Sequence, residues 1–412
     1  MVRLRRAVLL AAALWAAAAL PAQRNDEVFA EVDRISRELT RISGMPLRRK
    51  VACELISREK VNRFLNQRVK EVATPQEIRA EELTLKKFGL VPPDFDLAKT
   101  TVDLLTEQAA AFYDFNRKRL FITDTTPSAT REAALAHELA HALADQSLNL
   151  GRFIKQSGKS DDGSLARLAV MEGQATWMMS EYLARRMGTS LKDSPGLAEQ
   201  MSRSADSAAG QYPVFDGSPL YMRVTLIFPY TDGARFQQAV VERDGAAAFA
   251  EVFRRAPVST QQILHPAAYF AGTEPTIPGL PVFTERRYKT LAEGSFGELD
   301  HRILLEQYVG KEEAADASPH WKGGRYRVYD NRERSRQVLA YASDWDTPEA
   351  ARVFFGLYRT VLAKKWKKMQ VLTETGDRVA GVGDDGLFAL ALRGCVVTSL
   401  EGVEEPAGGA IH

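Results

Sequence analysis

The stretch from Arg131 to Gln146, REAALAHELAHALADQ, predicts an alanine- and leucine-rich helix with two histidines and a glutamate inside its apolar pattern. Residues four apart lie on one face of an α-helix, so His137 and His141 point in the same direction. Burying imidazole and carboxylate groups without partners costs free energy. The fold must therefore bring a polar partner or a metal ion to this face. The alternative is a plain helix that holds no metal.

The order His137-Glu138-x-x-His141 matches the pattern of zinc enzymes. At this spacing both imidazoles reach one Zn²⁺ at about 2.0–2.1 Å. Glu138 follows the first ligand directly and stays outside the coordination shell. It can take a proton from a metal-bound water and pass it to a leaving amine.

A catalytic zinc site usually has three protein ligands and a water, so one ligand is still missing. A third histidine six residues after His141 would require glycine at 144 and histidine at 147. Ala144 and Ser147 stand there instead, which excludes that class of site.

A glutamate on a later helix is the preferred third ligand. Glu172 lies inside a long helical stretch, 164–187, and Gly173 beside it would let two helices approach closely. Thr176, one turn further, could hydrogen-bond a ligand from outside the coordination shell. The rival acidic residues are Asp161, Asp162 and Glu181.

Asp145 follows His141 by one helical turn. It could accept the outer N–H of a zinc-binding histidine and fix the orientation of the ring. The alternative is a charge at the end of the helix.

The N-terminus has the pattern of a secretory signal peptide. MVRLRR is basic, the apolar run 7–20 is too short to span a bilayer, and Ala22 is a plausible cleavage point. We expect residues 1–22 to be removed and the protein to be exported, periplasmic or secreted, with no stable membrane span. An uncleaved anchor remains the alternative.

The pattern of apolar, charged and turn residues divides the chain into the signal peptide 1–22 and three further regions, 23–100, 101–285 and 286–412. After the signal peptide, 23–100 is helical, with a long amphipathic helix over 47–72, and either supports the fold or acts as an inhibitory pro-segment. Residues 101–285 form the metal-binding domain, with a hairpin of 111–115 and 120–123 before the histidine helix.

Residues 286–412 alternate in strand fashion around one helix near 348–364 and form a smaller α+β domain. Within it, Gly381 to Gly386 fits a glycine-rich nucleotide pattern, but a strand follows, which indicates a turn. The predicted fold class is α+β: a mainly helical, zincin-like domain with a small sheet, then the smaller α+β domain.

A formal net charge of +2 gives no basis for nucleic-acid binding. The basic run 364–368 is interpreted as the solvated end of a helix. Cys53 and Cys395 either pair after export or remain buried free thiols.

Two sequence motifs resemble those of a known group of enzymes. HELAHALADQ (137–146) and EGQAT (172–176) are similar to the zinc metallopeptidases whose third ligand is a glutamate on a second helix, the gluzincin or thermolysin-like group. The series FYD, LFI, LAHELAHALADQ, MEGQAT, FPYTDGARF and STQQILHP, within 108–270, resembles a family of exported bacterial proteins of largely uncharacterised function.

The resemblance implies Zn²⁺ bound by His137, His141 and Glu172, with Glu138 as the general base. It also implies a small sheet whose edge strand binds a peptide substrate by strand addition. No motif identifies the residue that stabilises the oxyanion. The candidates by chemical type are His265, Tyr221, Tyr230 and Tyr269.

The first functional hypothesis is therefore an exported zinc metallopeptidase acting on a peptide or protein substrate. A second is a module for binding or cell-envelope assembly that retains the metal without proteolysis and recognises a partner through 286–412. A third is metal-dependent hydrolysis of a non-peptide substrate.

Overall fold

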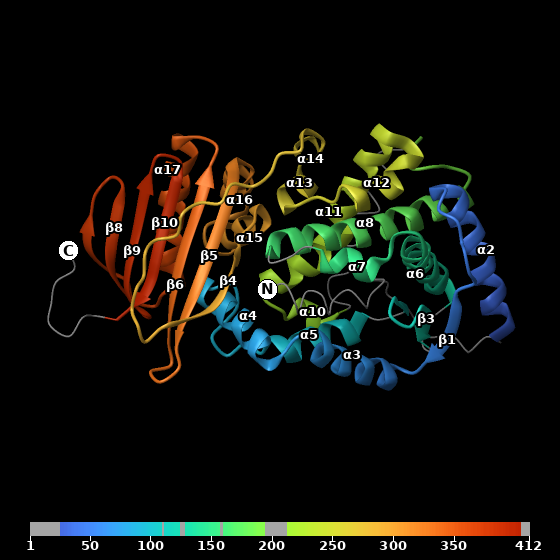
Figure 1. Cartoon of the computed structure of the whole chain (residues 1–412), viewed down its shortest axis with the longest axis horizontal. Coiled ribbons are helices and arrows are strands. Elements are labelled where there is room, and N and C mark those ends of the chain that lie inside the picture. The colour runs from blue at the N-terminus through green and yellow to red at the C-terminus, as the bar shows by residue number, and fades with distance from the viewer. Residues whose placement is uncertain (1–24, 109–110, 124–127, 157–159, 194–211, 405–412) are drawn as a thin grey trace.

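The computed structural model describes residues 25–108, 111–123, 128–156, 160–193 and 212–404, so the expected signal peptide 1–22 lies outside the described residues. The predicted α+β class is confirmed. A mainly helical region with a small mixed sheet is followed by a seven-stranded antiparallel sheet (Figure 1). Among the helices of the described residues, none combines the length and the apolar character that a membrane span requires.

The helical region is built around two long helices, α6 and α8, that carry the histidine and glutamate motifs. Its helices are α2 (Asn25–Ser43), α3 (Arg58–Val72), α4 (Pro75–Phe88), α5 (Leu97–Gln108), α6 (Ser128–Leu148), α7 (Leu150–Lys155), α8 (Asp161–Arg186), α10 (Pro213–Asp216), α11 (Leu220–Asp244), α12 (Ala248–Arg254), α13 (Thr260–Leu264) and α14 (Pro266–Ala271). Helix α2 packs on α6 and α8, and its Ile35 and Leu39 are buried in their core. The N-terminal helix thus supports the fold.

The small sheet has the strand order β1-β3-β2. Strands β2 (Ala111–Asp114) and β3 (Arg119–Thr123) form the predicted antiparallel hairpin. The predicted helix over 47–72 is wrong in its first part, because β1 (Ala52–Ile56) is a strand parallel to β3. Ladder hydrogen bonds to β3 outweigh the local helical pattern there.

The C-terminal sheet has the order β4-β5-β6-β10-β9-β8-β7 and is antiparallel throughout. Its strands are β4 (Lys289–Ser295), β5 (Trp321–Asn331), β6 (Arg336–Trp345), β7 (Gln370–Glu374), β8 (Arg378–Gly383), β9 (Gly386–Arg393) and β10 (Val396–Val403). The glycine-rich segment ends in the β8–β9 turn, where Gly383 pairs with Gly386, as predicted.

Three helices accompany this sheet. Helix α17 (Pro348–Lys365), the expected one, packs on β6, β9 and β10. Helices α15 (Glu298–Tyr308) and α16 (Lys311–Ala317) were not expected, and α15 packs on β5 and α17 (Figure 1). Cys395, in the β9–β10 turn, and Cys53, on β1, are free thiols.

An aromatic contact joins the helical region to the C-terminal sheet. Phe88, the last residue of α4, stacks on Phe296 with ring centroids 4.3 Å apart. The edges of the Tyr326 and Tyr341 rings meet it at 5.6 Å. The two parts therefore share one core.

A buried ion pair lies beside this contact. Lys365 donates to Glu401 at 2.5 Å and to the carbonyl of Lys87 at 3.1 Å. The interpretation of 364–368 as a solvated helix end is thus wrong for Lys365, whose side chain is only 6% exposed. A buried carboxylate and a carbonyl from the other part of the chain draw the ammonium group inward.

Candidate metal centre

The histidine helix α6 is buried on several sides because alanine and leucine surround the polar residues. Leu135, Leu139 and Leu143 are completely buried, and His137 and His141 are 2% and 9% exposed. The i, i+4 spacing places both rings on one face, with their centroids 4.8 Å apart.

Helix α8 brings Glu172 to that face, and three ligand atoms converge. The Nε2 atoms of His137 and His141 are 3.1 Å apart, and each lies 3.1 Å from Oε2 of Glu172. All three side chains are buried, and they form a group that could hold a metal ion.

This triangle has the dimensions of one face of a coordination tetrahedron. Ligands at about 2.05 Å from a tetrahedral metal are separated by about 3.3 Å. Two imidazole lone pairs and a carboxylate oxygen that all face one point repel each other unless a proton or a cation lies between them. The residues therefore fit a divalent cation, and a His₂Glu set is one that zinc uses.

Burial and the neighbouring charges shift the pKa values of Glu172, His137 and His141 in opposite directions. Burial raises the pKa of Glu172, but the His141 charge and hydrogen bonds from both rings outweigh it and lower the pKa to about 2. Burial lowers the pKa of His137. For His141 the charge of Glu172 outweighs burial, so its pKa is raised. The carboxylate is thus held ionised, as a metal ligand must be.

Glu138 lies between the ligand helix and the small sheet. Its Oε2 accepts a hydrogen bond of 2.7 Å from the backbone N–H of Tyr113 on β2. Burial, together with the charge of Glu172, raises the pKa of Glu138 to about 8. Because β2 is an outer strand of its sheet, the Tyr113 N–H is turned to this carboxylate of α6.

Two glycines allow the glutamate helix to approach its neighbour. Gly173, next to Glu172, contacts Gly233 of α11, and a Cβ on either residue would overlap the backbone of the opposite helix. Trp177 donates to Gln238 one turn further along at 2.5 Å, so α8 and α11 run parallel. The close approach expected at Gly173 is confirmed, and its partner is α11.

Tyr230, on α11, reaches the face of α6 that carries His137. Its ring stacks on His137, with centroids 5.8 Å apart. Burial, the charges of Glu172 and Glu138 and a hydrogen bond to Glu172 raise its pKa well above 10. Its hydroxyl is therefore a neutral donor beside two carboxylates.

The other three oxyanion candidates have different partners. His265 pairs with Glu298 at 2.8 Å. Tyr269 donates to the carbonyl of Arg255. Tyr221 lies 3.4 Å from Asp300. Of the three tyrosines and one histidine named from chemical type, the described structure brings Tyr230 to the triangle.

Asp145 and Thr176, which were expected to hydrogen-bond a metal ligand, have other surroundings in the structure. Asp145 is buried, but it accepts from the hydroxyl of Tyr113 at 3.0 Å and from Lys118 at 2.6 Å. It also accepts from the N–H of Leu150 at the end of α6. It therefore ties the hairpin to the helix. The Oγ1 atom of Thr176 is buried without a hydrogen-bond partner, so the expected bond to a ligand is not seen.

The other acidic candidates for the third ligand have hydrogen-bond or ion-pair partners away from the two histidines. Asp161 accepts from Tyr326 at 2.7 Å, and Asp162 accepts from Thr260 at 2.6 Å. Glu181 pairs with Arg185 at 2.7 Å. The first two hold the beginning of α8 against other parts of the chain.

Sequence reasoning missed two contributors to the site. The Tyr113 N–H is a backbone group, and its residue type gives no signal. Gly233 lies in FPYTDGARF, which served as a family signature, although a glycine inside a helical pattern is itself a sign of close packing.

Comparison with known proteins adds one match. Residues 286–412 match a family described as a domain of unknown function, DUF8575. No curated protein and no solved structure matches the chain. The match covers the C-terminal sheet domain and leaves α6 and α8 outside it.

Proposed function

We propose that the chain is a zinc-dependent peptidase, with His137, His141 and Glu172 as the metal ligands. The observation that carries this proposal is the triangle of three ligand atoms at 3.1 Å with Glu138 adjacent in the chain and buried beside it. When bound, Zn²⁺ would supply Lewis acidity toward a carbonyl oxygen and would acidify a water molecule.

The residues of the chain would supply the remaining steps. Glu138 takes the proton of the attacking water and returns it to the leaving amine. The hydrogen bond from the Tyr113 N–H holds the Glu138 carboxylate beside the triangle, where it can accept and release this proton. The Tyr230 hydroxyl donates a hydrogen bond to the negative oxygen that develops on the substrate carbonyl.

The outer strand β2 would orient the substrate. An extended peptide that pairs with β2 lies beside Glu138, since the Tyr113 N–H on that strand already reaches its carboxylate. The substrate is therefore a peptide or protein segment in an extended conformation. We also propose export of the protein, which the apolar run at 7–20 supports.

The test combines metal analysis with peptide-library cleavage. We expect about one zinc per purified chain, and cleavage that a chelator abolishes and zinc restores. Glu138→Gln should keep the zinc and lose about 10²- to 10⁴-fold in kcat/KM. Glu132→Gln, also on α6 but engaged in partly exposed ion pairs, is the matched control and should retain activity.

Two results would contradict the proposal. One is a purified chain without stoichiometric metal. The other is proteolysis that persists in Glu138→Gln. Bound zinc with no cleavage of any peptide would instead favour the metal-retaining binding module.

A further inference from the structure

The first turn of α8 is held by residues that come much later in the chain. The hydroxyl of Tyr326, on β5, donates to Asp161 at 2.7 Å, and the hydroxyl of Ser295, on β4, accepts from the backbone N–H of Asp162 at 3.1 Å. Thr260 of α13 donates to the carboxylate of Asp162 at 2.6 Å. Two of these three contacts come from the C-terminal domain, which therefore helps to fix where α8 begins.

Two glycines let the C-terminal domain approach this turn closely. A Cβ on Gly294 would overlap the carboxylate of Asp161, and a Cβ on Gly297 would overlap that of Asp162. Both aspartates are only 2% exposed. Burying a carboxylate costs free energy unless hydrogen-bond donors replace its bonds to water. The first turn of α8 is therefore stable in this buried position while the C-terminal domain stays docked on it.

Helix α8 transmits this placement to the candidate metal centre. Asp161 precedes Glu172 by eleven residues, which is about 16 Å of unbroken α-helix. Toward the other end of the helix, Arg34 of α2 donates to the hydroxyl of Tyr182 at 2.6 Å. Figure 1 shows α8 running from the C-terminal sheet toward α2. Glu172 thus lies near the middle of a rod whose two ends are held by different parts of the chain.

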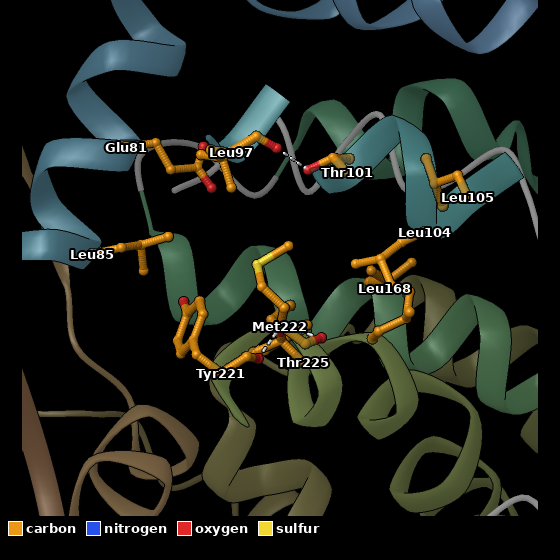
Figure 2. Close-up of a pocket in the computed structure, with 12 residues that line it drawn as sticks. Glu81, Leu85, Leu97, Thr101, Leu104, Leu105, Leu168, Tyr221, Met222 and Thr225 are labelled. Atoms are coloured by element: carbon orange, nitrogen blue, oxygen red, sulfur yellow. Dashed lines mark hydrogen bonds between the residues drawn. The ribbon is translucent and has the colours of Figure 1, made fainter. Parts of the chain in front are cut away.

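Packing beside the first half of α8 leaves room for a shift. A pocket of about 40 Å³ lies between α4, α5, α8 and α11, and Leu165 and Leu168 of α8 line it. Figure 2 shows Met222 of α11 extending into this space. Well-packed interiors contain few voids larger than a water molecule. Close packing holds α8 less firmly on this side, so the polar contacts with the C-terminal domain contribute more to its position.

We propose that Tyr326 and Ser295 are positioning residues of the candidate metal centre. Through the first turn of α8 they hold Glu172 at the two histidines, about three helical turns away. The C-terminal domain is thereby part of the metal site, although none of its residues is a ligand. This inference rests on the metal ligands of the proposed function.

The test compares two double variants of the full chain that remove the same atoms from the same sheet. Tyr326→Phe with Ser295→Ala removes both hydroxyls that hold α8. Tyr341→Phe with Ser343→Ala is the matched control, because it removes a buried tyrosine hydroxyl and a buried serine hydroxyl whose bonds stay within the C-terminal domain.

The two variants should differ in zinc affinity. Competition with a chromogenic chelator gives the Kd for zinc, and urea unfolding gives the stability of each variant. The Tyr326/Ser295 variant should bind zinc about tenfold more weakly than wild type, the lower end of the loss seen for an outer partner of a metal ligand. The Tyr341/Ser343 variant should keep the wild-type Kd, although it also loses stability with its buried hydrogen bonds.

The outcomes separate this inference from the proposed function. Tyr326→Phe alone is the milder change, and it should raise the Kd about threefold even if the double variant does not fold. A Kd that neither Tyr326 variant changes, or that rises equally in the control, overturns the positioning role and leaves the peptidase. A wild-type chain that binds no zinc overturns both. Zinc binding that depends on Tyr326, without cleavage of any peptide, supports the positioning role and overturns the peptidase alone.

Discussion

Gly173 on α8 and Gly233 on α11 contact each other directly, backbone to backbone, beside the candidate metal ligand Glu172. The missing side chains let two parallel helices approach more closely than ordinary packing allows. This contact places Glu172 and Tyr230 on adjoining surfaces. The geometry of the metal triangle thus depends on two residues that have no functional group.

Gly233→Ala should weaken zinc binding. The new methyl group would overlap the carbonyl of Ala169 and push α8 away from α11, so Glu172 would move out of the triangle. We expect the Kd for zinc to rise about 10- to 100-fold, as for loss of a residue that orients a metal ligand. Competition with a chromogenic chelator measures it. Gly356→Ala, in a helix with open space around the added carbon, should leave the Kd unchanged.

Tyr230→Phe should separate catalysis from metal binding. The ring that stacks on His137 is retained, while the hydroxyl beside Glu172 is lost. We expect kcat to fall about 10²-fold, with KM and zinc content close to wild type, because the donor acts on charge that develops in the transition state. An unchanged kcat in steady-state kinetics would assign Tyr230 a packing role only. Tyr269→Phe is the control, since its hydroxyl bonds to a carbonyl elsewhere.

Phe88→Ala should destabilise both parts of the chain together. The ring is 1% exposed and fills a space between Phe296, Tyr326 and Tyr341. Removing a buried phenylalanine costs about 3–5 kcal/mol of unfolding free energy. Urea unfolding followed by tryptophan fluorescence measures the loss.

Variants at Phe88 also test whether the two parts of the chain share one core or have two independent cores. Phe88→Leu refills most of the space and should recover more than half of the lost stability. If Phe88→Ala unfolds in two separate transitions with one of them unchanged, the two parts do not share a core.

His301 should make stability depend on pH. It lies in the C-terminal core, where Nδ1 donates to the carbonyl of Gly297 and Nε2 accepts from Tyr341. Burial lowers its pKa from 6.5 to about 3. The unfolded chain therefore binds the extra proton between these values, and the contribution of His301 to stability is lost as the pH falls below about 6.5.

The expected loss from this residue is about 2 kcal/mol between pH 7 and pH 5. His301→Gln should be less stable than wild type at pH 7 but should lose less of its stability at pH 5. Urea unfolding at both pH values gives the difference. An equal slope in His301→Gln would contradict the prediction.

The local part of the site could be predicted from the sequence because it depends on helix geometry. The spacing of His137 and His141 places them on one face in any α-helix. The glycine after Glu172 favours this residue as the third ligand, and the structure brings its Oε2 to 3.1 Å from the Nε2 atoms of both histidines. The hairpin before α6 followed from β-prone runs around a polar turn.

Contacts between distant segments could not be predicted. Strand β1 has a helical pattern, and its pairing with β3 decides its structure. Lys365 has the sequence context of an exposed residue, yet Glu401 lies beneath it. Tyr230 could be named only by type, since nothing in the sequence indicates which aromatic residue stacks on His137.

Helices α8 and α11, which contact each other at Gly173 and Gly233, could be placed on two separate polypeptides. Residues 187–219 connect α8 to α11 in the sequence; all three candidate metal ligands precede them, and Gly233 and Tyr230 follow them. Two polypeptides cut within this connection would each contain one of the two contacting helices. Zinc binding by the first fragment should then require the second, so metal uptake would report the association of the two halves.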